Sequence, residues 1–148
     1  MAQKVCWGIL STAMINDVVI AGMRKAARSE LVAVSSRDSK KAKDYAATRN
    51  IPRAYGSYEE MLADPDLDAV YISVPNTLHR EWAVKATDAG KHVLCEKPLV
   101  TTMSDFRKVE DAATKAAPPG CADVGQARDV AVDQLDQPVV QPADHLCI

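Results

Sequence analysis

Hydrophobic and polar positions follow two different periods along the first 116 residues of the chain. Short, nearly continuous apolar runs are typical of strands that are covered on both faces, and stretches with apolar residues at helical spacing separate them. The apolar runs are residues 5–10, 31–34, 69–74 and 92–95, with a shorter one at 54–55. This alternation of strand and helix predicts a doubly wound α/β fold with a parallel sheet and right-handed crossovers.

Residues at the ends of the expected helices carry side chains that commonly begin or end a helix. Asn16 is expected to cap the helix after the first strand. Ser57 and Glu60, three positions apart, have the pattern of a capping box and predict a brief helix through Leu62. Gly90 is placed to end the helix that precedes the fifth strand.

The alternating pattern stops near residue 116. A Pro-Pro-Gly sequence at residues 118–120 interrupts it, and residues 121–148 contain no convincing strand. We therefore expect one α/β domain over residues 1–116, followed by an atypical tail over residues 117–148 that is irregular or disordered.

Composition and charge limit the kinds of molecule that this chain is expected to bind. The 148 residues carry a net charge of −2 and are 47% hydrophobic, which fits a globular domain and gives no basis for a nucleic-acid or anionic-membrane partner. No apolar run approaches the roughly 20 residues of a membrane span, and the polar start Met-Ala-Gln-Lys is no secretory signal. The 4 cysteines have the spacing of neither a zinc site nor a redox pair, so we expect reduced thiols in a cytoplasmic protein and no metal site.

The turn after the first strand is the first place where chemistry is expected. Dinucleotide-binding folds usually have Gly-x-Gly-x-x-Gly there, because glycine lets the backbone approach a pyrophosphate. This sequence has Ser11-Thr12-Ala13-Met14-Ile15-Asn16 instead, with small residues at 11 and 13. Taken alone, the segment is better explained as a plain strand-to-helix turn. Its place at a helix N-terminus, which favours anions, also suits a phosphate.

The end of the second strand is where side chains distinguish the two nicotinamide cofactors. An acidic residue there would bind the ribose hydroxyls of NAD, whereas the sequence has Ser35-Ser36-Arg37-Asp38. Hydroxyls and the paired donors of a guanidinium suit the 2′-phosphate of NADP. The alternative is a solvated Arg37 paired with Asp38 or another surface carboxylate. The pattern favours NADP, with NAD possible.

Two more polar segments follow strands at the same edge of the expected sheet. Residues 75–79, Pro-Asn-Thr-Leu-His, come after the fourth strand at the switch point where open parallel sheets bind ligands. Asn76 as a helix cap and His79 as a surface residue are the alternatives. Glu96 and Lys97 end the fifth strand, where a solvated ion pair is the ordinary explanation. A lysine at this position can also point into the cleft and exchange a proton with a substrate oxygen.

Three segments together resemble the glucose–fructose oxidoreductase and inositol dehydrogenase (Gfo/Idh/MocA) family. They are residues 5–13, 54–60 and 90–98, with the sequences VCWGILSTA, AYGSYEE and GKHVLCEKP. The resemblance runs from residue 4 to about 116, and its nearest branch is similar to NADP-dependent sugar (D-xylose) and dihydrodiol dehydrogenases. It implies that residues 1–116 are a dinucleotide-binding Rossmann domain.

The resemblance also implies a role for each matching residue. Lys97 would be the catalytic residue that contacts the reacting hydroxyl or carbonyl, and Arg37 would hold the 2′-phosphate. Glu96 would contact the cofactor ribose, with Asn76 and His79 on the nicotinamide side. The full set of implied cofactor-binding residues is Ser11, Thr12, Ala13, Met14, Ile15, Ser36, Arg37, Pro75, Asn76, His79, Glu96 and Lys97.

Family members continue into a second, mostly antiparallel domain that supplies the substrate pocket, and we expect that domain to be missing here. The implied function is the NADP(H)-binding domain of an oxidoreductase that transfers a hydride between a nicotinamide cofactor and a sugar-like or diol secondary alcohol. The alternatives are a non-catalytic NADP-binding module and an inactive fragment. Self-association through the uncovered face is a further possibility.

The strand order is expected to be 3-2-1-4-5, so that Leu10, Ser73 and Cys95 end at one edge of the sheet. In that order Cys6 and Cys95 are two strands apart. At about 4.8 Å per strand they are too distant for a disulfide.

Dehydrogenase turnover by the 148-residue chain is expected to be negligible, with NADP binding weakened but detectable. The reason is that about 7–11 kcal/mol of barrier lowering depends on enclosing and orienting the substrate. An assay of the purified chain beside its Lys97→Ala variant, with NADP and a panel of sugars and diols, checks this. Robust turnover that Lys97→Ala abolishes would show that the chain is a complete enzyme.

Overall fold

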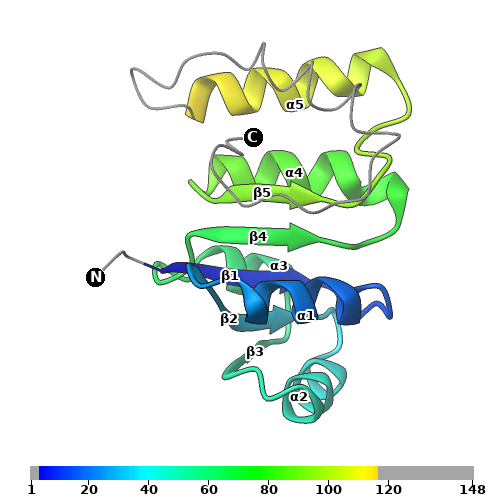
Figure 1. The fold of residues 1–148 in the computed structure, drawn as a ribbon. Helices are drawn as coiled ribbons and strands as arrows, with labels where there is room; N and C mark the ends of the chain where they lie inside the picture. The colour runs from blue at the N-terminus through cyan, green and yellow to red at the C-terminus, as the bar shows by residue number, and fades with distance from the viewer. Residues whose placement is uncertain (1–3, 117–148) are drawn as a thin grey trace.

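A single parallel sheet organises the part of the chain that this computed structural model describes, residues 4–116. Its order is β3-β2-β1-β4-β5, which confirms the predicted topology (Figure 1). The strands are β1 Val5–Leu10, β2 Ser29–Ser35, β3 Arg53–Tyr55, β4 Ala69–Ile72 and β5 His92–Cys95. The irregular tail expected over residues 117–148 lies outside the described residues.

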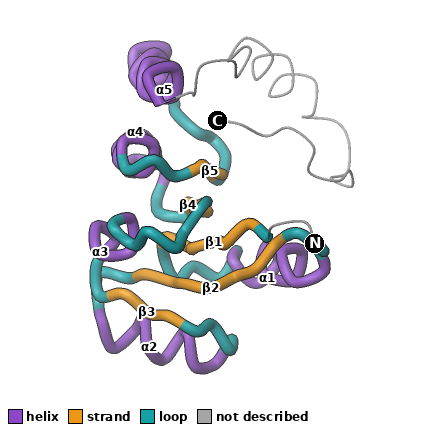
Figure 2. The backbone as a smooth tube through the Cα atoms, turned by 90° about the vertical axis from the view of Figure 1, so that its left-hand side faces the viewer, coloured by secondary structure: helices purple, strands orange, loops and turns teal. Residues whose placement is uncertain are grey.

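Helices cover both faces of the sheet, which is why the strands have nearly continuous apolar sequences. Figures 1 and 2 show α1 on one face and α3 and α4 on the other, with α5 beside α4 beyond β5. The helices are α1 Asn16–Lys25, α2 Ser39–Thr48, α3 Tyr58–Leu62, α4 His79–Asp88 and α5 Met103–Ala116, and the 3-10 helix η1 Asn76–Leu78 precedes α4.

The sheet separates two apolar clusters. Ile9, Val34 and Tyr71 point to the face where residues of α1 and α2 pack. Leu10 and Val70 belong to the opposite cluster, which includes side chains of α3, α4 and α5. Neighbouring strand residues thus contribute to opposite layers, and the central position of β4 buries all of its residues.

The register of the parallel strands sets the positions of the segments that follow them. Leu10 pairs with Ser35 of β2 and with Ile72 of β4, and Ile72 pairs with Cys95 of β5. The residues after these strands therefore meet at one edge, the carboxyl edge, as predicted. Because β4 lies between β1 and β5, Cys6 is separated from Cys95, and both thiols are free.

Two helix starts differ in detail from the sequence prediction. Asn16 does not cap α1: the cap position is Ile15, it makes no side-chain cap hydrogen bond, and Asn16 is a fully buried residue of the first turn. Ser57 caps α3 as predicted, by accepting a hydrogen bond of 3.1 Å from the Glu60 amide. Glu60, however, accepts from the amide of Gly56 rather than from that of Ser57, so the capping box is displaced by one residue.

Gly8 permits α3 to pack closely on β1. A Cβ at this position would lie 3.0 Å from the sulfur of Met61 and 3.1 Å from Cδ1 of Leu67, and both side chains belong to the core. Gly22, in α1, has no atom within 4 Å of the corresponding position. The two glycines therefore allow a matched comparison.

Gly8→Ala is expected to lower the free energy of unfolding by about 1–3 kcal/mol, because core side chains must move to admit the methyl group. Gly22→Ala is expected to raise it by roughly 0.5–1 kcal/mol, since alanine is favoured over glycine within a helix. Urea denaturation followed by circular dichroism measures both changes. A Gly8→Ala variant as stable as Gly22→Ala would contradict the close packing of α3.

Candidate functional site

The turn between β1 and α1 has a glycine-like backbone although it contains no glycine. Ser11 has φ = 117°, a region that L-residues other than glycine rarely occupy. Its hydroxyl shares a hydrogen bond of 2.7 Å with the hydroxyl of Ser73 and accepts one of 3.2 Å from the amide of Ala13. These bonds hold β1 to the end of β4 and stabilise a conformation that glycine adopts without strain.

The same turn presents unpaired backbone donors. Among residues 4–116, the amides of Thr12, Met14 and Ile15 donate no hydrogen bond to a protein acceptor. The side chains of Met14 and Ile15 are 89% and 48% exposed, so this end of α1 is open to solvent. The amides of the first helical residues, Asn16 to Val18, bond within the turn, so the free amides are those just before α1, where they can donate hydrogen bonds to an anion.

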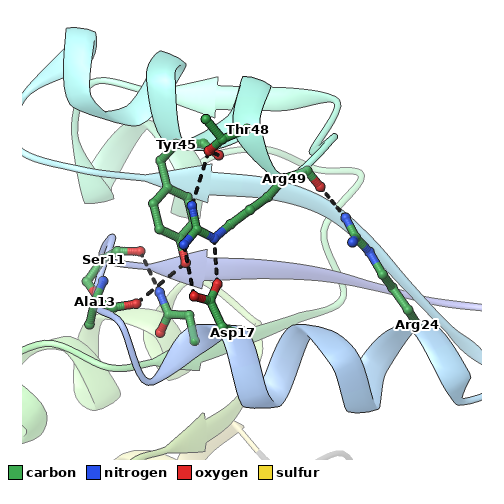
Figure 3. A network of polar contacts seen from close by, with 8 residues as sticks. Ser11, Ala13, Asp17, Arg24, Tyr45, Thr48 and Arg49 are labelled. Carbon is green, nitrogen blue, oxygen red and sulfur yellow. Dashed lines mark hydrogen bonds and ion pairs between the residues drawn. The ribbon is translucent and has the colours of Figure 1, made fainter.

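Two polar side chains, those of Asn16 and Tyr45, contact the turn, and Figure 3 shows the Tyr45 hydroxyl directed toward Ala13. The side-chain amide of Asn16 donates a hydrogen bond of 3.0 Å to the carbonyl of Ser11, and its carbonyl oxygen is buried without a partner among the described residues. The hydroxyl of Tyr45 lies 3.5 Å from the carbonyl of Ala13. Burial raises the pKa of Tyr45. This role of Tyr45 depends on a contact between α2 and the turn, residues 32 positions apart, which the local sequence does not display.

Arg49, at the end of α2, joins that helix to α1 (Figure 3). Its guanidinium donates to both carboxylate oxygens of Asp17, at 2.6 and 3.0 Å, and lies 3.8 Å from the centre of the Tyr45 ring. The hydrogen bond from Arg49 holds the pKa of Asp17 below its usual value. Arg24 in turn donates to the carbonyl of Arg49. The start of α1 is thereby tied to the end of α2.

The segment after β2 leaves Arg37 without an anionic partner. Asp38, the partner considered in the sequence analysis, caps α2 by accepting a hydrogen bond of 3.0 Å from the amide of Lys41. Ser36 is buried, and its hydroxyl accepts one of 3.3 Å from the amide of Asp38. Arg37 is exposed, lies near the hydroxyl of Tyr58, and forms no ion pair within residues 4–116.

The segment after β4 contains both exposed and buried candidates. Pro75 and Asn76 are exposed, and Asn76 begins η1 instead of capping α4, whose cap position is Leu78. His79 is fully buried rather than a surface residue, with its ring nitrogens each 2.8 Å from a carbonyl oxygen, those of Val74 and Pro98. His79 thus connects the segment after β4 to the segment after β5.

The segment after β5 separates two side chains that the sequence places next to each other. Glu96 accepts a hydrogen bond from the hydroxyl of Tyr71 and donates its own amide, at 2.9 Å, to the carbonyl of Ile72. Lys97 is exposed and makes neither an ion pair nor a hydrogen bond within the described residues. The solvated Glu96–Lys97 pair considered from the sequence is therefore absent. The Lys97–Pro98 peptide bond is cis.

Burial dominates the electrostatics beneath this segment. It raises the pKa of the Cys95 thiol to about 12, with a smaller contribution from the charge of Glu96, and it also raises the pKa of Tyr71. Both groups are therefore neutral near pH 7. Over residues 4–116, no group of acidic, histidine and cysteine side chains could hold a metal ion, and no helix is long and apolar enough to cross a membrane.

A doubly wound parallel sheet with free amides, an unpaired arginine and an unpaired lysine at its carboxyl edge defines a dinucleotide-binding domain. The chain belongs to the Gfo/Idh/MocA family, because residues 7–118 match the family described as "Oxidoreductase family, NAD-binding Rossmann fold". Residues 4–116 thus contain the NAD(P)-binding Rossmann domain that the sequence predicted.

Individual relatives agree with the family assignment. The chain is 47% identical over 105 residues to D-xylose 1-dehydrogenase (NADP(+)) 2 of Haloferax volcanii, covering 71% of this chain and 32% of the relative. It is 45% identical over 117 residues to trans-1,2-dihydrobenzene-1,2-diol dehydrogenase of Xenopus laevis, covering 78% and 35%. A solved 3-ketoreductase from Actinomadura kijaniata in complex with NADP is 30% identical, with a TM-score of 0.72 over 77% of this chain and 36% of that one.

The chain spans about a third of the length of these curated relatives. What is shared is the nucleotide-binding domain, and the activities of the whole relatives belong to longer proteins.

Ser11→Gly is expected to unfold with a free energy about 1–2 kcal/mol higher than that of Ser11→Ala, because both lose the hydroxyl but only glycine is unstrained at this positive φ. Thermal or urea unfolding of the two variants measures the difference. The order of alanine and glycine should be the reverse of that at Gly22. If Ser11→Ala is the more stable variant, the turn does not have the glycine-like conformation.

Proposed function

We propose that this chain binds NADP(H) at the carboxyl edge and belongs to an oxidoreductase that transfers a hydride between the cofactor and a sugar-like or diol secondary alcohol. The observation that carries the proposal is the presence at this edge of two cations, Arg37 and Lys97, with no ion-pair partner within residues 4–116. Exposed cations elsewhere in the described chain are of both kinds, since Lys40 and Lys85 are paired with carboxylates whereas Lys25 and Arg28 are not. The support therefore comes from the place of Arg37 and Lys97 at the same edge as the free amides of the turn.

The turn after β1 would bind the pyrophosphate. The amides of Thr12, Met14 and Ile15, just before the 10-residue helix α1, are free to donate to it. Ser11 keeps the backbone in the required conformation through Ser73, and Ala13 has no long side chain to block approach. In the absence of a ligand, water satisfies exposed amides of this kind, so the match of residues 7–118 to the NAD-binding family is what favours a pyrophosphate over a plain strand-to-helix turn.

Arg37 would recognise the 2′-phosphate, which distinguishes NADP from NAD. Its guanidinium is exposed beside the buried hydroxyl of Ser36, and Asp38 is engaged at the start of α2. A guanidinium with no competing carboxylate can donate two parallel hydrogen bonds to a phosphate. The NADP named in complexes of related proteins supports this choice for the present chain.

The segments after β4 and β5 would hold the nicotinamide end. Pro75 and Asn76 are exposed at the switch point, and His79 fixes the distance between the two segments through the carbonyls of Val74 and Pro98. Glu96 would accept a hydrogen bond from a ribose hydroxyl with the carboxylate oxygen that Tyr71 does not occupy. His79 would therefore act by positioning these segments, since its ring is buried.

Lys97 would exchange a proton with the substrate oxygen. When bound, the cofactor supplies the hydride chemistry, and the protein supplies orientation and the proton. An ammonium group free of a carboxylate can donate a proton to an oxygen that develops negative charge, and the neutral amine that remains can take the proton back in the reverse direction. The substrate class, a sugar or a diol, follows the names of the relatives and remains part of the proposal.

Arg37→Ala is expected to weaken NADPH binding by roughly 10- to 100-fold and to leave NADH binding nearly unchanged, because a hydrogen bond to a charged group contributes about 1.5–3 kcal/mol. Titration of nicotinamide fluorescence with both cofactors measures the effect. Arg28→Ala, which removes an exposed arginine before β2, serves as the control and should alter neither affinity. Equal affinities of the unmutated chain for the two cofactors would refute the role of Arg37, and absence of saturable binding of either would refute the proposed function.

A further inference from the structure

Tyr71 lies in the centre of the fold but contacts the carboxyl edge through its hydroxyl. The residue is 1% exposed and packs in the cluster formed with α1 and α2. Its hydroxyl donates a hydrogen bond to Oε1 of Glu96, which lies one residue beyond β5. The backbone pairing between Tyr71 and Leu94 brings these two groups together although they are 25 residues apart in the sequence.

Lys97 makes no ion pair with the carboxylate of its neighbour Glu96. The two residues are neighbours in the sequence, and a lysine side chain has four flexible carbons that can bring its ammonium group to an adjacent carboxylate. In the structure no such ion pair forms, and Oε1, one of the two carboxylate oxygens of Glu96, accepts a hydrogen bond from Tyr71. Lys97 remains exposed and unpaired within the described chain.

We propose that Tyr71 is a positioning residue that draws the Glu96 carboxylate toward β4 and thereby keeps the ammonium group of Lys97 free for a substrate oxygen. The part of this inference that concerns substrate rests on the proposed function. The contact between Tyr71 and Glu96, and its effect on Lys97, are properties of the chain alone.

The surroundings of Tyr71 keep its hydroxyl protonated and its ring in one position, so the hydroxyl can act as a hydrogen-bond donor. Burial is the main cause of the raised pKa of Tyr71, and the carboxylate of Glu96 adds to it, so the phenol keeps its proton through the physiological pH range. The ring is fixed by its apolar neighbours on β1 and β2, such as Ile9 and Val34. A hydrogen bond from a fixed neutral donor to a carboxylate is stronger than one between two neutral groups.

The test is the rate at which acetic anhydride modifies Lys97 at pH 8, measured by peptide mass spectrometry on the full 148-residue chain. Tyr71→Phe retains the ring and removes only the donor, so Glu96 becomes available to Lys97. Because an ammonium group paired with a carboxylate is acylated more slowly, we expect the rate at Lys97 to fall by about twofold to fivefold. Lys25, which is exposed and has no ion pair within residues 4–116, is the internal reference and should be unchanged.

A double variant separates this effect from a general loosening of the core. In a Glu96→Gln background no carboxylate is available, so adding Tyr71→Phe should leave the Lys97 rate unchanged. An equal effect of Tyr71→Phe in both backgrounds would mean that it acts through the fold, and the inference would be overturned. No effect in the unmutated background would overturn it as well.

Glu96→Gln alone gives an independent test if Tyr71→Phe proves unstable. Since Lys97 is already free, this variant should modify Lys97 at the rate of the unmutated chain. A faster rate would show that Glu96 and Lys97 are paired in solution and would overturn the inference. These measurements use no cofactor, so a failure of NADPH binding contradicts the proposed function and leaves the role of Tyr71 to be decided by the labelling rates.

Discussion

The candidate site depends on the in-register pairing of β4 with its two neighbours. Ile72 pairs with Leu10 on one side and with Cys95 on the other, so three strands end together. Every polar group of the site follows one of these ends or the end of β2. If β4 shifted by one residue, its apolar side chains would exchange faces, and the whole core would oppose the change. The packing of the sheet thus fixes the position of the chemistry.

The fold was largely predictable, because the signals that specify it are local. Alternating apolar runs and helical stretches indicated a doubly wound parallel sheet, for which the observed order 3-2-1-4-5 is a usual one, and Gly90, with φ = 75°, ends the helix before β5 as expected. The signals at helix starts were less specific. An asparagine before a helix commonly caps it, yet Asn16 is buried beneath the turn and donates to Ser11 instead. Burial, which the local sequence does not display, decided its role.

The sequence predicted where the candidate site lies but not which side chains contact each other within it. The residues after the strands were found from position alone, since parallel strands bring their carboxyl ends to one edge. The contacts of Glu96 with Tyr71 and of His79 with Pro98 join residues 25 and 19 positions apart. Such contacts require knowledge of which strands and loops are neighbours and of where side chains point. The ordinary expectations, an ion pair of Glu96 with Lys97 and a surface histidine, were therefore wrong.

His79 connects the two segments that would hold the nicotinamide, the one after β4 and the one after β5. Its ring lies 2.8 Å from the carbonyl oxygens of both Val74 and Pro98, so one buried side chain contacts both the segment bearing Asn76 and the segment bearing Lys97. Because this ring is buried, water cannot replace its contacts, and moving either segment would break one of them. A buried side chain therefore sets the distance between the group that would orient the cofactor and the group that would move the proton. Binding does not have to create that distance.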